Sequence, residues 1–155
     1  MDWFVKAFVK ASLVWLALGV TLGVAMAAHP AWVAYRPAHM HMNLLGFVTM
    51  MIYGVAYHVI PRFTGHALHS RRLAGWHWWV SNGGLALMVV GFVLRVHVGA
   101  GATPVLATGG VLSALGAYTF GWVVWRTMDG RATPQGVTAR AASTGRAPLP
   151  GARPA

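Results

Sequence analysis

The segment RPAHMHMNLLGFVTMMIYGVAYHVIPR, residues 36–62, decides how the rest of the sequence is interpreted. Two histidines, His39 and His41, stand near its start, each followed by a methionine. The remainder up to Pro61 is an apolar run of about 20 residues, the length that crosses the hydrocarbon core of a bilayer as a helix. The segment therefore predicts a membrane-spanning helix that begins with two imidazoles.

The composition of the chain also favours a membrane protein. Of its 155 residues, 57% are hydrophobic and only 9% are charged, which is unusual for a soluble domain. Short polar or Pro/Gly-bearing joints separate four apolar stretches of spanning length, at residues 7–28, 39–60, 76–98 and 104–125. We therefore expect residues 1–128 to form an all-α, four-span integral membrane helix bundle.

The basic residues are distributed unevenly between the two sides of this expected arrangement. Together, 12 Lys and Arg against two acidic residues give a formal net charge of +10. One side would carry Lys6, Lys10, Arg62, Arg71, Arg72 and the arginines of the C-terminal tail. The other would carry only Arg36 and Arg95, so the positive-inside rule predicts a multi-pass inner-membrane protein with both termini cytoplasmic. The expected partner of this charge is the anionic surface of the lipid bilayer, not nucleic acid.

The two ends of the chain differ in character. Residues 129–155 are rich in Pro, Gly, Ala and Arg and lack a periodic apolar face, which predicts a disordered basic cytoplasmic tail. Residues 1–28 contain lysines, an apolar run and a final Met-Ala-Ala, features that a cleavable signal peptide shares. The apolar run is long for a signal peptide, so we expect these residues to be retained, with cleavage as the alternative.

Eight histidines and no cysteine leave imidazole and thioether groups as the expected metal ligands. The expected topology divides the histidines into an outer group of His29, His39, His41 and His97 and an inner group of His58, His66, His69 and His77. Along one helix, His41 and His58 would be about 25 Å apart, so the two groups belong to separate sites. Residues two apart on a helix differ by about 200°, so His39 and His41 would face nearly opposite directions.

Two cofactors suit imidazoles in an apolar bundle without thiols. A b-type haem would be held between imidazoles from two helices, with Arg36 and Arg95 available for its propionates. Copper is the alternative, because the HMHM motif at residues 39–42 places two thioethers beside two imidazoles. We prefer haem because methionine is also a common apolar filler in helices. Interfacial histidines that bond only to water and headgroups are the third possibility.

The order of motifs in the middle of the chain resembles a known family. An H-x-H begins the apolar stretch HMHMNLLGFVTMMIYGVAYHVIPRFTG, and a short loop leads into the aromatic-rich ALHSRRLAGWHWWVSNGG. These features resemble the tenth and eleventh membrane helices of subunit I of haem–copper oxidases and nitric oxide reductases. The flanking spans would then correspond to the ninth and twelfth helices. The chain is thus similar to a four-helix portion of that subunit.

The resemblance implies roles for the outer histidines. It implies that His39 ligates a high-spin haem and that His41 ligates a low-spin haem on the opposite face, so two haems are conceivable. It gives His58 and His77 structural roles. A second axial ligand would come from His29 or His97, or from another copy of the chain in a homo-oligomer.

The departures from the family limit the expected function. The helices that carry the family's copper-binding histidines and crosslinked tyrosine have no counterpart here, and no Asp or Glu lies within the expected spans. We therefore expect electron transfer or diatomic-gas binding at a b-type haem, and no oxygen reduction or proton pumping by this chain alone. The alternatives are a cofactor-free accessory or assembly subunit of a respiratory oxidase and an outer-face copper-handling protein. The sequence does not indicate a redox partner.

Overall fold

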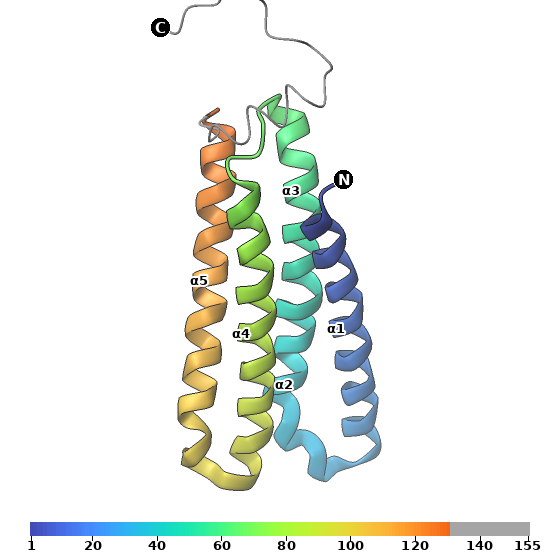
Figure 1. Ribbon diagram of the computed structural model, residues 1–155. Coiled ribbons are helices and arrows are strands. Elements are labelled where there is room, and N and C mark those ends of the chain that lie inside the picture. The colour runs from blue at the N-terminus through green and yellow to red at the C-terminus, as the bar shows by residue number, and fades with distance from the viewer. Residues whose placement is uncertain (131–155) are drawn as a thin grey trace, which may run out of the picture.

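The computed structural model describes residues 1–130, and over that range every regular element is a helix. Four rods run side by side in antiparallel order, as Figure 1 shows. The first, third and fourth rods are α1 (Trp3–Ala28), α4 (Arg71–Val98) and α5 (Thr103–Met128). The predicted tail lies, from residue 131 on, outside the described residues.

The second rod is a continuous helix of three parts that follow one another without a break. They are α2 (Arg36–His41), the π-helical segment η2 (Met42–Thr49) and α3 (Met50–Thr64). Short 3-10 helices join the rods at one end of the bundle, which is called the η1/η3 end below, and these are η1 (Pro30–Tyr35) and η3 (Gly99–Ala102). The opposite end, which holds the start of α1, is called the N-terminal end (Figure 1).

Small and capping residues set the boundaries of the helices. The hydroxyl of Ser70 accepts a hydrogen bond of 3.3 Å from the backbone N–H of Leu73 and so caps the start of α4. Gly65, with φ of 69°, ends α3, and Gly99, with φ of 59°, ends α4. Both are backbone conformations that residues with a Cβ rarely adopt. Proline occupies the first turn of α2 and of α5, where its missing N–H removes no helical hydrogen bond.

The outward faces of the helices are apolar. Three helical stretches are long and apolar enough to cross a membrane: Trp3–Ala28, Pro30–Thr64 and Arg71–Met128. The third contains both α4 and α5, which fold back on each other at η3 (Figure 1). Their most apolar windows reach mean hydropathies of 2.0, 1.6 and 1.9, yet only 11%, 28% and 17% of those windows are buried. Apolar surface left outside the core is typical of a lipid-facing bundle, and the predicted all-α membrane fold is confirmed.

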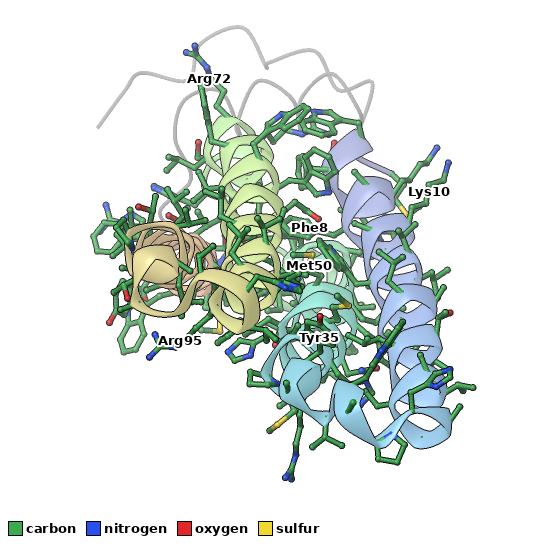
Figure 2. The ribbon with its side chains drawn as sticks, turned by 90° about the horizontal axis from the view of Figure 1, so that it is seen from below. Phe8, Lys10, Tyr35, Met50, Arg72 and Arg95 are labelled. Atoms are coloured by element: carbon green, nitrogen blue, oxygen red, sulfur yellow. The ribbon has the colours of Figure 1, made fainter. Side chains whose placement is uncertain are left out.

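Each apolar stretch predicted from the sequence lies inside one of the rods, and each rod is longer than its stretch. The added residues include Lys6, Arg36, Arg71 and Arg126, because a charged residue interrupts an apolar run without ending a helix. Figure 2 shows this arrangement along the rods: Phe8 and Met50 lie between the helices, whereas Lys10, Arg72 and Arg95 extend away from them. Phe8 and Met50 are 0% and 2% exposed, so the bundle has a closed interior despite its apolar outer surface.

The π-helical segment η2 interrupts the regular helix predicted over residues 39–60. The hydroxyl of Thr49 donates to the carbonyl of Leu44, five residues earlier, at 2.8 Å, which suits the wide turn of a π-helix. Gly46 lies against Trp15 of α1, and a Cβ at Gly46 would come within 2.5 Å of the Trp15 Cβ. Apolar periodicity could not reveal this segment, because both helix types accept the same residues. Such segments are frequent at functional sites.

Helices α4 and α5 touch through their backbones. A Cβ on Gly109 of α5 would lie 2.5 Å from the backbone nitrogen of Met88, and one on Gly84 of α4 would lie 2.7 Å from the backbone nitrogen of Ser113. Helices in lipid associate through such close contacts between small residues, because burial of apolar surface gives them little advantage there. The α4–α5 hairpin therefore depends on glycine at these two positions.

We predict that Gly109→Ala lowers the stability of the bundle, because the new methyl group would clash with the backbone of α4, which cannot move aside as a flexible side chain could. Overpacking of this kind costs about 1–3 kcal/mol, and thermal unfolding in detergent micelles would measure it. Gly110→Ala is the matched control, since a Cβ there meets nothing within 4 Å. Equal unfolding temperatures for the two variants would contradict the close packing of α4 against α5.

Candidate functional site

His39 lies on the side of α2 that meets α1. Its Nδ1 is 2.8 Å from the carbonyl oxygen of Gly19. A carbonyl oxygen only accepts, so Nδ1 donates in this contact and the lone pair of the neutral ring resides on Nε2. The Asn43 amide, 3.4 Å from the same Nδ1, donates instead to the carbonyl of His39 at 2.9 Å. A Cβ on Gly23 would lie 2.8 Å from the ring carbon Cε1 of His39. Gly23 therefore makes room for this imidazole, whereas Gly19, whose Cβ would lie 2.6 Å from Nδ2 of Asn43, makes room for an amide.

His41 faces a different helix. Its ring packs against Phe92 of α4 with 4.7 Å between ring centroids, and its Nδ1 is 2.8 Å from the carbonyl oxygen of Pro37. Again the carbonyl requires Nδ1 to donate, which leaves Nε2 as the nitrogen with a lone pair. His39 thus contacts α1 and His41 contacts α4, in agreement with the separation expected from their spacing.

The other four candidate residues lie at the same η1/η3 end. His29 caps the C-terminus of α1 and is exposed, with its ring 5.5 Å from that of Trp32. His97, in the last turn of α4, has its Nε2 3.1 Å from the hydroxyl of Tyr35, a contact that the sequence did not indicate. The two candidate arginines, Arg36 and Arg95, are exposed.

These six residues share one end of the bundle without forming one cluster. Within residues 1–130, no group of three or more His, Asp or Glu residues is placed to hold a metal ion. Tyr35 joins His97 to η1, and none of the hydrogen bonds or ring contacts of the described chain joins one outer imidazole to another. A ligand bound here would contact only one of these histidines at a time, because His39 and His41 lie on different sides of α2.

The methionines of the HMHM motif do not support the copper alternative. Met40 is 44% exposed, whereas Met42 is 9% exposed and belongs to the interior. Because His39 and His41 also contact different helices, the four side chains point in separate directions and cannot surround one cuprous ion.

The N-terminal end contains a histidine that, unlike the four at the η1/η3 end, is fully buried. His77 of α4 is 1% exposed and its Nδ1 lies 2.9 Å from the hydroxyl of Tyr57. The rings of Phe8 and Tyr53 lie 4.8 and 4.5 Å from its own, so it is part of the aromatic core. Its Nε2 has no hydrogen-bond partner within the described residues. Sequence reasoning gave His77 a structural role but could not identify Tyr57 as its partner, because the pair joins two helices.

A comparison with known protein families relates the middle of the chain to respiratory oxidases. Residues 32–108 match the family model of Cytochrome C and Quinol oxidase polypeptide I, just under half of the chain. The matched segment begins in η1 and ends in the first turns of α5, so it includes His39, His41 and His97. No curated protein matches the chain. This segment is therefore similar to part of subunit I of the haem–copper oxidases.

We predict that Tyr57→Phe destabilises the protein, because it leaves Nδ1 of the buried His77 without a partner. The expected loss is about 1–3 kcal/mol, and thermal unfolding in detergent would measure it. Adding His77→Phe should recover part of this loss, since removing both partners leaves no unpaired polar group. Tyr118→Phe, at a tyrosine that is 75% exposed, is the control and should have no effect. A double variant less stable than Tyr57→Phe would contradict this account.

Proposed function

We propose that the protein is a membrane-embedded b-type haem-binding protein in which His41, and next His39, supplies an axial imidazole. The observation that carries the proposal is the bond from Nδ1 of each ring to a backbone carbonyl, of Pro37 and Gly19 respectively. Metal-ligating histidines almost always use their second ring nitrogen in this way, which fixes the tautomer and aims the other nitrogen. The family match over residues 32–108 supports the same assignment.

The surroundings of the two rings suit a bound haem in part. Haem, when bound, supplies a redox-active iron, and the chain orients the imidazole and holds the acidic side chains of the group. For His41 the orientation comes from Phe92 and the Pro37 carbonyl. Arg36 and Arg95 are exposed at the same end and have no ion-pair partner among residues 1–130, so both are available for propionates. Within the described residues, no second histidine contacts His39 or His41 and could serve as the other axial ligand.

We propose that a second copy of the chain, or a partner subunit, completes the coordination. His97 already has a hydrogen-bond contact with Tyr35, and the ring of His29 lies 5.5 Å from that of Trp32. Neither contacts His39 or His41 in the described chain. The outer faces of the rods are apolar and free within this structure, which is the kind of surface through which membrane subunits associate.

The proposed role is electron transfer, or binding of a diatomic gas where one axial position stays open. The proposed setting is the cell inner membrane, with four spans and the η1/η3 end on the outer side. The distribution of basic residues supports this orientation, because Lys6, Arg62, Arg71 and Arg72 lie at the N-terminal end. The proposal involves no oxygen reduction, since the spans carry no carboxylate for proton transfer.

The haem assignment predicts a reduced-minus-oxidised visible spectrum with b-type bands for the protein purified after expression with added haem precursor. His41→Ala should remove most of these bands and His39→Ala should weaken or shift them, because each loses an axial nitrogen. His58→Ala is the control, since His58 lies on α3 near Arg62 at the other end. A wild-type protein that copurifies with oxidase subunits and shows no haem band would establish the accessory-subunit alternative instead.

The shared-ligand proposal predicts that the haem-loaded protein is an oligomer in the membrane. Crosslinking in native membranes should trap a dimer or larger species, and His41→Ala should reduce its yield while leaving the monomer folded. A bis-imidazole spectrum from a protein that remains strictly monomeric would show that His29 or His97 provides the second ligand within one chain.

A further inference from the structure

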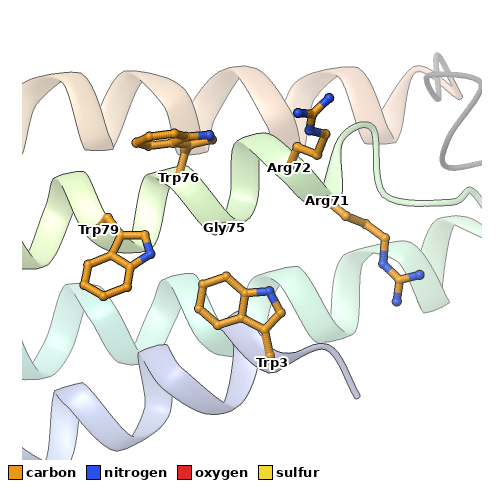
Figure 3. A pocket seen from close by; sticks show the side chains of 6 residues that line it. All are labelled: Trp3, Arg71, Arg72, Gly75, Trp76 and Trp79. Carbon is orange, nitrogen blue, oxygen red and sulfur yellow. The ribbon is translucent and has the colours of Figure 1, made fainter.

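A groove of about 700 Å³ lies at the N-terminal end, between the first turns of α1 and α4. Figure 3 shows its residues: Gly75 marks the middle, Trp3 and Trp79 lie on one side, and Trp76 with Arg72 lie on the other. A Cβ on Gly75 would come within 3.0 Å of the Trp3 ring, so the glycine lets the indole lie close to α4. The volume is in the range of sites that bind small molecules.

The walls of the groove are aromatic and largely uncovered. Trp3, Trp76 and Trp79 are 54%, 67% and 62% exposed, although indoles of this size are usually buried in a protein core. Tryptophan is enriched where a membrane meets water, because its ring is apolar while its N–H can bond at the headgroup level. The groove therefore has apolar walls of the kind that suits the level where lipid chains meet their headgroups.

The charge at the mouth of the groove is positive. Arg71 forms an ion pair with Asp2, which compensates its charge. Arg72 has no acidic partner within the described residues, so two cations face one anion and one positive charge remains. Both arginines also lie in the first turn of α4, where the partial positive charge of the helix N-terminus adds to the attraction of an anion.

We propose that this groove is a binding site for one anionic glycerophospholipid of the membrane leaflet on that side. Arg72 binds the phosphodiester, because a guanidinium group forms paired hydrogen bonds with phosphate oxygens. An acyl chain lies in the groove, with the indoles of Trp3 and Trp79 on one side and that of Trp76 on the other. The site rests on the proposed membrane setting and is independent of haem, since it lies at the opposite end of the bundle from His39 and His41.

Native mass spectrometry of the delipidated protein in detergent tests the site by titration with phosphatidylglycerol and with phosphatidylcholine of the same acyl chains. We expect tighter binding of phosphatidylglycerol, and a loss of about fivefold in its affinity in Arg72→Gln, the loss typical for one arginine at a membrane surface. Trp79→Ala should weaken both lipids, since it removes an apolar wall. Its side chain is exposed, so the substitution leaves the core intact.

Two matched controls separate this site from a general surface effect. Arg62→Gln removes an arginine at the same end that does not line the groove, and Trp125→Ala removes a tryptophan that is 66% exposed on α5. Neither should change lipid binding. The proposal would be overturned by equal affinity for the two lipids, or by an Arg72→Gln variant that binds phosphatidylglycerol as tightly as the wild type does. Displacement of the lipid by sn-glycerol 3-phosphate alone would overturn it as well. The visible spectrum of the same variants should remain that of the wild type. A negative result for lipid binding would therefore leave the haem proposal untouched, and a missing haem band would leave the lipid proposal untouched.

Discussion

In hydrocarbon, each backbone carbonyl and N–H must find a partner within the protein, and the arrangement of this chain follows from that constraint. The helices satisfy almost all of these groups, and the few polar side chains within them bond back to the same backbone. Thr21, Thr108 and Thr119 each donate to a carbonyl one turn earlier at 2.8 Å. Nδ1 of His41 likewise donates to a carbonyl one turn earlier, whereas Nδ1 of His39 donates to a carbonyl of the neighbouring helix α1. In both rings this leaves Nε2 as the nitrogen with a lone pair.

The two ends of the bundle differ in how their side chains pack. Toward the N-terminal end, aromatic rings enclose His77, and the interior is closed around Phe8 and Tyr57. Toward the η1/η3 end, the histidines and arginines are partly or fully exposed, and His39 and His41 each contact a neighbouring helix. The enclosed aromatic core and the proposed haem ligands therefore lie at opposite ends of the bundle.

The sequence was sufficient for the helical membrane fold, because apolar runs of spanning length and near-absent charge leave few alternatives. It also predicted that His39 and His41 would address different neighbours, since their spacing fixes the angle between them. It did not identify the bonds from Tyr35 to His97 and from Tyr57 to His77, which join separate helices and so depend on how the rods are paired. Gly23 of α1 illustrates the same limit. A glycine within a helix signals that some group approaches closely, and only the packing of the helices shows that this group is the ring of His39.

The π-helical segment also determines which face the ends of the second rod present. His41 and Tyr57 are sixteen residues apart, and an α-helix turns by about 100° per residue, so an unbroken α-helix would place them about 160° apart. Yet both contact α4, through Phe92 and His77 respectively. The wide turns of η2 rotate less per residue and reduce that difference. The segment thus changes the rotation between the two ends of the rod, so that His41 near one end and Tyr57 near the other both face α4.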